Sequence, residues 1–253
     1  ALECAVPATA VACGYRRGMS IYDHASPHRS AKWVLTLDLE GFFPSIKAER
    51  LQMLLREVVG LDRTCIRLIL ALCLKDGLPQ GAPTSPVLSN LACVRFDEDL
   101  HALAMRMGCT VTRYADDICI SRQSPDPPTE LIVIDSRGIK LGQVLRDLIE
   151  RNGYRVNERK TKFSTKPARH MVTGLVVGDR IDMPRKWKRQ LRVLERLLAV
   201  HGEDAASAIL SDWDVGQLGT KPPRSISAVV SGKRAFREYL VRRSTGELFR
   251  NDD

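Results

Sequence analysis

Two β-prone runs meet at a pair of neighbouring acids in the segment Arg113-Tyr114-Ala115-Asp116-Asp117-Ile118-Cys119-Ile120-Ser121. Asp is depleted in strand interiors and neighbouring anions repel each other, so we expect Asp116 and Asp117 at the tight turn of a β-hairpin. A divalent cation bound there would offset the repulsion. An isolated Asp-Asp pair is more often plain turn chemistry, so its interpretation depends on what the chain places beside it.

A third carboxylate follows an apolar run upstream. Residues 32–46 predict a buried strand along which side chains alternate, so that Leu35 and Leu37 share one face while Thr36 and Asp38 share the other. Asp38 facing the acidic hairpin would complete a site for two Mg²⁺ ions, or for Mn²⁺ in their place, because these ions take carboxylate oxygens together with phosphates and water. Two such ions can clamp an in-line phosphoryl displacement.

A Gly/Pro-rich loop at residues 77–86 lies between these two elements. Gly77 and Gly81 permit a close approach of the backbone to a ligand, and Gln80 offers an amide where a base pair or a sugar could lie. Gly/Pro loops are common, so this loop alone indicates only a boundary before a helix.

These three segments, in this order, resemble successive motifs of reverse transcriptases, and more narrowly of the bacterial retron type. Residues 157–162 are similar to the family's lysine-bearing segment that follows the hairpin, and residues 231–236 resemble its thumb helix. Val172-Thr173-Gly174 matches a retron element in full. His24-Ala25-Ser26-Pro27-His28 matches the retron element Asn-Ala-x-x-His, except that His24 stands where Asn is usual.

The resemblance implies an α+β fold, the palm of a right-hand polymerase with partial fingers and a small helical thumb. We expect residues 1–30 to be a remnant of the fingers, 31–180 the catalytic palm and 181–253 the thumb. The family's basic finger segment usually precedes residues 14–18, and this sequence begins too late to include it. The sequence is then a fragment, or its fingers are supplied elsewhere, or they have been lost.

The predicted catalytic residues and metal ligands are Asp38, Asp116 and Asp117. The resemblance implies the backbone carbonyl of Leu39 as a further metal ligand. It also implies that the Phe43 ring blocks a ribonucleotide 2′-hydroxyl, although core packing is the alternative because Phe42 is adjacent and only one of the two rings can face the site.

The other predicted site residues contact nucleotides or nucleic acid. Gln80 resembles the family's nucleotide-contacting glutamine, and Lys160 is expected to reach the primer or the phosphates. Tyr114 is placed near the primer terminus, with strand packing as the alternative, and Thr173 and Gly174 where a turn would grip the primer.

The formal charge of +9 is concentrated in one part of the chain. Residues 155–196 hold 13 Lys and Arg against 4 Asp and Glu, a difference of +9, so the rest of the chain sums to zero. Such a stripe is typical of phosphate-backbone binding, with a solvated basic face as the alternative. A helix beginning at Asp182 or Pro184 would put an apolar stripe on one side and a basic side toward the duplex, formed by Arg185, Lys186, Lys188, Arg189 and Arg192.

Composition narrows the remaining possibilities. No apolar run approaches the roughly 18 residues that a membrane helix needs, which predicts a soluble, cytoplasmic protein, and the retron resemblance implies a bacterial one. Seven cysteines without a Cys-x-x-Cys pair favour free thiols over a disulfide framework or a zinc site. His24 and His28 stand four residues apart, but Pro27 between them disfavours the helix that would let them share a metal.

Hydrophobic periodicity predicts helices at about 47–59, 62–74, 85–107 and 139–152, with a strand at 131–134 and Gly153 as a helix C-cap. Mixed strands and helices in this order suit an α+β palm.

The leading hypothesis is an RNA-directed DNA polymerase that copies a structured RNA template and primer into DNA from dNTP substrates. The retron resemblance further implies phage defence together with an effector protein. An abortive-infection type reverse transcriptase is the nearest alternative. From a different class, the chain could be a nucleic-acid-binding scaffold without turnover, since the usual fingers lie outside this sequence.

Overall fold

The computed structural model describes residues 2–136, 138–166, 169–211 and 225–245, which form two compact units. The first unit comprises residues 1–173 and 177–179, and the second comprises 174–176 and 180–253. A small three-stranded sheet is made of β7 (His170–Val172), β8 (Leu175–Val177) and β9 (Ile181–Asp182).

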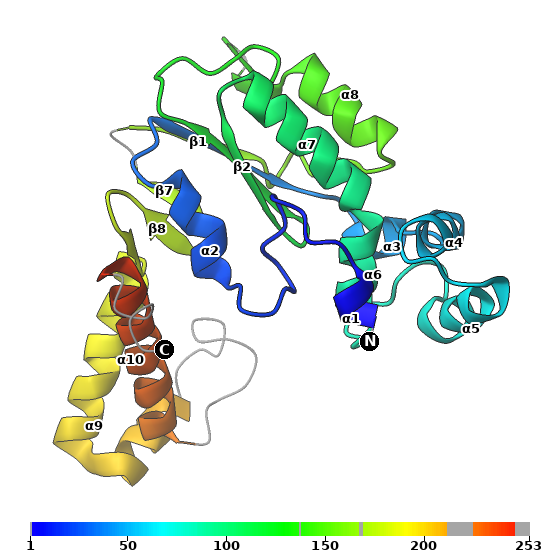
Figure 1. Ribbon diagram of the computed structural model, residues 1–253. Coiled ribbons are helices and arrows are strands. Elements are labelled where there is room, and N and C mark those ends of the chain that lie inside the picture. Colours follow the sequence, from blue (N-terminus) through cyan, green and yellow to red (C-terminus); the bar gives the residue numbers. More distant parts are fainter. Residues whose placement is uncertain (1, 137, 167–168, 212–224, 246–253) are drawn as a thin grey trace. The chain divides into compact units, whose positions relative to one another are not determined.

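A four-stranded sheet forms the centre of the first unit (Figure 1). Its strands run in the order β2 (Thr110–Tyr114), β3 (Asp117–Arg122), β1 (Trp33–Asp38) and β6 (Lys162–Thr165), and each neighbouring pair is antiparallel. β-Branched and aromatic residues dominate β1 to β3, as a half-buried pleated surface requires. A two-stranded sheet of β4 (Ile132–Asp135) and β5 (Gly138–Leu141) stands apart from it.

Helices follow the predicted periodicity in part. The expected helices 47–59 and 62–74 are α4 (Ala48–Glu57) and α5 (Arg63–Cys73), and Asp62 caps α5 by accepting hydrogen bonds from the backbone of the next turn. The other helices are α1 (Leu2–Ala5), α2 (Ile21–Ala25), α3 (Phe42–Ser45), α6 (Ser85–Ala92), α7 (Val94–Arg106), α8 (Gln143–Arg151), α9 (Arg185–Ser211), α10 (Ile226–Thr245) and a 3₁₀ turn, η1 (Ser26–His28).

Two helix predictions are wrong in their extent. The single helix expected at 85–107 is broken at Cys93 into α6 and α7, where the backbone departs from α-helical geometry with ψ −3° and the Cys93 N–H also bonds to the Asn90 carbonyl three residues back. The helix expected at 139–152 begins only at Gln143, since residues 138–141 pair as β5. Gly142 separates strand from helix at a point where an added Cβ would lie 2.3 Å from the backbone of Glu130.

The two faces of the main sheet carry different chemistry. One face presents Leu35, Leu37, Ile118 and Ile120, which pack against α7 in a buried apolar core. The alternation of the strands places Asp38, Thr112, Tyr114 and Asp117 on the opposite face, part of which α2 and η1 cover.

The cover formed by α2 and η1 is tied down by two buried histidines. The His28 ring lies 2.7 Å from both the Ser121 and Thr112 hydroxyls, and His24 Nδ1 lies 2.8 Å from Thr112 Oγ1. Burial lowers the pKa of each histidine to about 3, so both rings are neutral at physiological pH. His24, which stands where Asn is usual in the retron element, therefore takes part in a hydrogen-bond network that joins α2 and η1 to β2 and β3.

The second unit is built on α9 and α10, whose apolar sides pack together through Leu191, Leu194, Ala206, Ile226 and Val230. The helix predicted to begin at Asp182 or Pro184 begins at Arg185, because Asp182 belongs to β9. Gly202, in the left-handed region at φ 73°, breaks α9 near its C-terminal end. In the described part of the chain, no helix combines the length and the apolar character needed to cross a membrane.

Candidate active site

Three carboxylates come together at the ends of adjacent strands. Asp38, the last residue of β1, is the direct cross-strand partner of Asp117, the first residue of β3, and Tyr114 of β2 is the partner of Asp117 on its other side. Opposite residues of antiparallel strands have Cβ atoms about 5 Å apart. The Leu39 N–H donates to the Asp116 carbonyl at 3.1 Å, which fixes the hairpin turn against the end of β1.

Mutual repulsion and burial disturb the charge of the acidic hairpin. Loss of solvent raises the pKa of Asp117 to about 6, and the nearby Asp116 and Asp38 charges add to the shift. Burial, and then the Asp38 charge, also raise the pKa of Asp116. Ionisation of the two hairpin carboxyls therefore costs free energy, and a bound cation would remove that cost.

Lys160 is brought to the same place by backbone pairing. Residues 155–160 run beside the end of β1, where the Asn157 N–H donates to the Asp38 carbonyl and the Glu40 N–H donates to the Arg155 carbonyl, both at 2.8 Å. The Lys160 ammonium then reaches Asp38 Oδ1 at 2.9 Å. This pairing with Asp38 raises the pKa of Lys160, whose own side chain is largely exposed.

The Gly/Pro loop is held beside the predicted sugar gate. The Leu78 N–H donates to the Phe43 carbonyl at 3.1 Å, and a Cβ on Gly77 would lie 2.4 Å from the Pro44 carbonyl oxygen, so only glycine fits. Phe42 is 3% exposed and lies in the core, whereas Phe43 is partly buried and packs against the same core. Gln80 is exposed in this loop.

A buried ion pair supports the hairpin from behind and was not predicted from the sequence. The guanidinium of Arg113 on β2 binds both carboxylate oxygens of Asp97 on α7, at 2.6 and 2.8 Å, and both side chains are fully buried. Arg113 also donates to the Ala115 carbonyl at 3.1 Å, and Ala115 has a left-handed backbone with φ 57°. An acid at a core-facing register of α7 was the available signal, since such a position needs a buried cationic partner.

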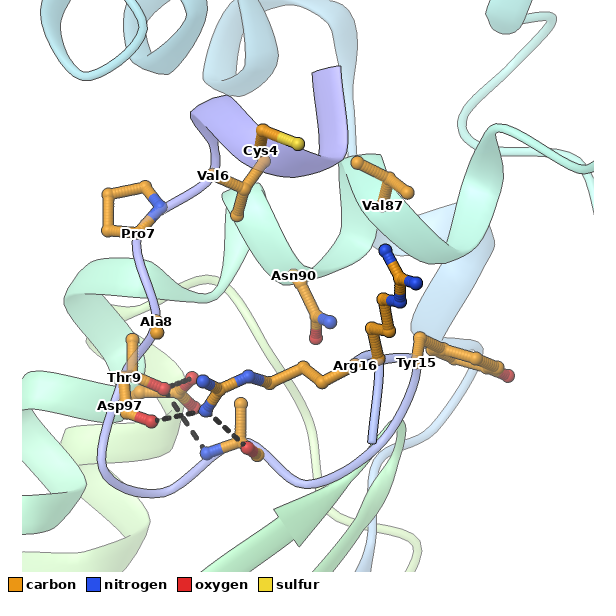
Figure 2. A pocket seen from close by; sticks show the side chains of 12 residues that line it. Cys4, Val6, Pro7, Ala8, Thr9, Tyr15, Arg16, Val87, Asn90 and Asp97 are labelled. Carbon is orange, nitrogen blue, oxygen red and sulfur yellow. Dashed lines mark hydrogen bonds between the residues drawn. The ribbon is translucent and has the colours of Figure 1, made fainter. Parts of the chain in front are cut away.

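Residues 9–16 form hydrogen bonds to Asp97 of this buried pair and to one another (Figure 2). The Thr9 hydroxyl donates to Asp97 at 2.7 Å, and the Arg16 guanidinium donates to the carbonyls of Thr9 and Ala12 at 2.9 and 3.0 Å. The Arg16 guanidinium is thus engaged with its own loop. A cavity of about 280 Å³ lies here, with Asn90 on its wall.

The predicted nucleic-acid-binding residues beyond the hairpin lie later in the chain. Thr173 and Gly174 form the turn between β7 and β8 with φ of 43° and 79°, the two left-handed residues that a two-residue hairpin turn requires. On α9, Lys188 is half-buried and pairs with Asp182. Its basic neighbours are exposed, namely Arg185, Lys186, Arg189 and Arg192.

The three side chains offer carboxylate oxygens, the donor type that hard divalent cations prefer. The described residues contain no preformed group of three or more His, Cys, Asp or Glu side chains that encloses a metal position. Asp38, Asp116 and Asp117 nevertheless supply carboxylate oxygens at one edge of the sheet, and Mg²⁺ is usually held by one or two carboxylates while phosphates and water complete its shell. The donor set therefore suits a cation that arrives with a phosphate-bearing substrate.

Comparison with known proteins gives consistent matches. The family model described as reverse transcriptase (RNA-dependent DNA polymerase) matches residues 2–194. The chain is 33% identical over 181 residues to the retron Ec86 reverse transcriptase of Escherichia coli, which covers 71% of this chain and 53% of that protein. It is 34% identical over 222 residues to the retron Mx162 reverse transcriptase of Myxococcus xanthus, with 74% and 44% covered.

Among solved structures, an apo telomerase from Candida tropicalis aligns with a TM-score of 0.44 and 11% identity, over 65% of this chain and 36% of that one. The chain spans about half the length of the two retron relatives. The family model and the two relatives each cover more than two thirds of the chain, and so this protein belongs to the reverse transcriptase (RNA-dependent DNA polymerase) family and is related to its retron members.

Proposed function

We propose that this chain catalyses RNA-directed DNA synthesis by two-metal-ion deoxynucleotidyl transfer. The observation that carries the proposal is the cross-strand pairing of Asp38 with Asp117 beside Asp116, with the pKa of both hairpin carboxyls raised. A fold gains nothing from three crowded anions unless a cation compensates them. The family assignment supports the same chemistry.

The reaction joins a primer 3′-oxygen to the α-phosphorus of a deoxynucleoside triphosphate. The bond from the α-phosphorus to the bridging oxygen breaks, pyrophosphate leaves, and the 3′-hydroxyl gives up its proton. Asp38, Asp116 and Asp117, with the Leu39 carbonyl, hold the divalent cations in this proposal. Bound there, the two cations would lower the pKa of the 3′-hydroxyl and neutralise the charge that develops on the phosphates.

Other side chains position the substrates. Phe43 supports the proposed sugar gate because its ring, unlike that of buried Phe42, is partly exposed beside the loop of Gln80. The Lys160 ammonium is free to pivot from Asp38 to a phosphate, since its side chain is 62% exposed. Tyr114, Thr173 and Gly174 are proposed to contact the primer strand, and the exposed basic side of α9 to contact the duplex backbone.

The retron relationship supports finer proposals about the biological setting. We place a structured RNA as template and primer, with dNTPs as substrates and an effector protein as a partner in phage defence. These proposals concern the activity of a whole retron-type protein. The chain spans about half the length of its two retron relatives.

Primer extension on an RNA template with dNTPs and Mg²⁺ tests the proposed function. We expect the wild-type chain to extend the primer and the double variant Asp116→Ala, Asp117→Ala to show no extension, with a loss of at least about 10³-fold. Thermal unfolding of the variant should remain cooperative, because the substitutions remove repulsion and break no ion pair.

The matched control is Asp126→Ala, which removes a carboxylate from an exposed loop and should leave extension unchanged. Wild-type protein that binds the template duplex with strong salt dependence but never extends it would refute the polymerase proposal for this chain. That result would favour the nucleic-acid-binding scaffold instead.

A further inference from the structure

Tyr15 occupies a backbone conformation that a non-glycine residue adopts only at a cost. Its φ is 58°, in the left-handed region, where an L-residue loses roughly 1–2 kcal/mol. The residue is 40% exposed and is not part of the buried core. Strained residues of this kind cluster at functional sites, where the surrounding structure holds them in place.

The surrounding structure holds Tyr15 against the catalytic hairpin. A Cβ on the preceding Gly14 would lie 2.7 Å from the Ala115 backbone nitrogen, so the chain passes over the hairpin turn in direct contact with it. Asn90 donates a hydrogen bond to the Gly14 carbonyl at 2.9 Å, and the Cys13 N–H donates to the Arg113 carbonyl at 2.8 Å. The position of Tyr15 is therefore set by the same elements that set the hairpin.

The Tyr15 ring lies between two rings of the proposed substrate site. Its centroid is 6.3 Å from that of Phe43 and 6.2 Å from that of Tyr114, both within the range of aromatic contact. Burial, followed by the charge of Asp116, raises the pKa of the Tyr15 phenol, which agrees with a position beside the carboxylates. Figure 2 shows the ring directed away from Thr9 and Asp97, which lie at the other end of the cavity.

We propose that Tyr15 is a nucleotide-binding residue, whose exposed ring packs on the incoming deoxynucleotide between the Phe43 gate and Tyr114. Phe43 is assigned to the sugar and Tyr114 to the primer terminus, so the ring between them meets the nucleotide that is about to be joined. Aromatic faces bind any base, because every base presents a π-face. The inference rests on the proposed function, since it needs a nucleotide at this site.

The test measures nucleotide affinity without turnover. A primer ending in a dideoxynucleotide is annealed to an RNA template and bound by the protein in Mg²⁺. The next correct dNTP is then titrated, and the fraction of protein–duplex complex that survives addition of a competitor is measured at each concentration. We expect Tyr15→Gly to raise the Kd of the dNTP by about 5- to 150-fold, the range for loss of one base–aromatic stack. Tyr15→Phe, which keeps the ring, should stay within about twofold of wild type.

Tyr15→Gly also separates function from folding. Glycine adopts φ 58° without strain, so the variant should unfold at the same temperature as wild type or higher. Met19→Ala removes another exposed apolar side chain from the same segment, 39% exposed, and serves as the control with unchanged affinity.

The outcomes distinguish this inference from the proposed function. If the correct dNTP stabilises the wild-type complex and Tyr15→Gly binds it equally well, the role of Tyr15 is overturned while the polymerase proposal stands. A wild-type complex that the correct dNTP does not stabilise at all overturns both. Loss of affinity in Tyr15→Gly, with retention in Tyr15→Phe and Met19→Ala, supports the inference.

Discussion

The carboxylates at the hairpin repel one another, and a role in binding cations explains this arrangement better than a contribution to folding does. Asp117 is partly withdrawn from water beside two other carboxylates, and its pKa is raised to about 6. The folded protein therefore binds a proton more tightly at this site than the unfolded chain does. Stability from this group is present below the unfolded pKa of about 3.8 and is lost as the pH rises through 6.

Asp117→Asn should consequently stabilise the protein without divalent cations at pH 7.5, by about 1 kcal/mol once solvent screening of the half-buried group is allowed for. Near pH 3, below the unfolded pKa, where the carboxyl is largely protonated in both states, the difference should vanish. Urea unfolding of both proteins in EDTA at the two pH values measures this. An equal difference at both pH values would mean that the gain comes from packing and not from charge.

The sequence alone predicts that the three carboxylates lie together, as the pairing of Asp38 with Asp117 shows, but it does not predict the residues that support them. Asp38, Asp116 and Asp117 can be found because alternation along a strand and the turn preference of Asp are local properties. Tyr15 cannot, because its importance depends on which distant strand lies beside it. The core-facing register of Asp97 indicates that it needs a buried cationic partner but does not identify Arg113 as that partner. For the same reason the sequence does not decide between a gate and core packing for Phe43, whose ring is less buried than that of Phe42 and still packs against the core.

At the scale of elements, the hairpin is held by the helix behind it. Arg113 and Asp97 join β2 to α7 through a bidentate pair with no solvent exposure, and Arg113 reaches on to the turn at Ala115. Helix periodicity predicted the apolar side of α7 but carried no information about this pair. The late start of the predicted 139–152 helix likewise follows from strand pairing, because residues 138–141 pair with β4 and this pairing overrides their helix propensity.

Arg113→Met should cost about 3–5 kcal/mol of stability, because it leaves the Asp97 charge buried without its partner. Adding Asp97→Leu should recover much of that loss, since the double variant buries no unpaired charge. The control is Arg95→Met, which breaks an exposed pair with Glu57 at 2.7 Å and should cost at most about 1 kcal/mol. Urea unfolding compares the three, and similar losses for Arg113→Met and Arg95→Met would contradict the role given to the buried pair.

At the scale of the whole molecule, charge is divided unevenly along the chain. Residues 155–196 carry the entire net charge of +9, while the remainder is neutral overall. This basic region includes Lys160 at the proposed site and the exposed basic residues of α9 in the second unit. Binding of a nucleic-acid duplex should therefore depend steeply on salt, because each phosphate bound by the protein releases counterions.

Replacing Arg185, Arg189 and Arg192 together by Gln should weaken duplex binding and flatten its salt dependence. The slope of log K against log[salt] should fall in magnitude by about one for each phosphate that the variant no longer binds, so by up to about three. The control triple replaces Arg63, Arg67 and Lys75, which are exposed on and just after α5, and changes the net charge equally. Fluorescence anisotropy over a range of KCl concentrations gives both slopes.

The comparison of the two triples separates a binding surface from general attraction. If the duplex binds to a surface on α9, only the first triple changes the slope, because only phosphates that the protein touches release counterions. General attraction follows the net charge, which both triples lower by the same amount, and would change both affinities alike. Equal effects would thus mean that the basic stripe is only a solvated face. A slope change in the α9 triple alone would mean that α9 binds the duplex.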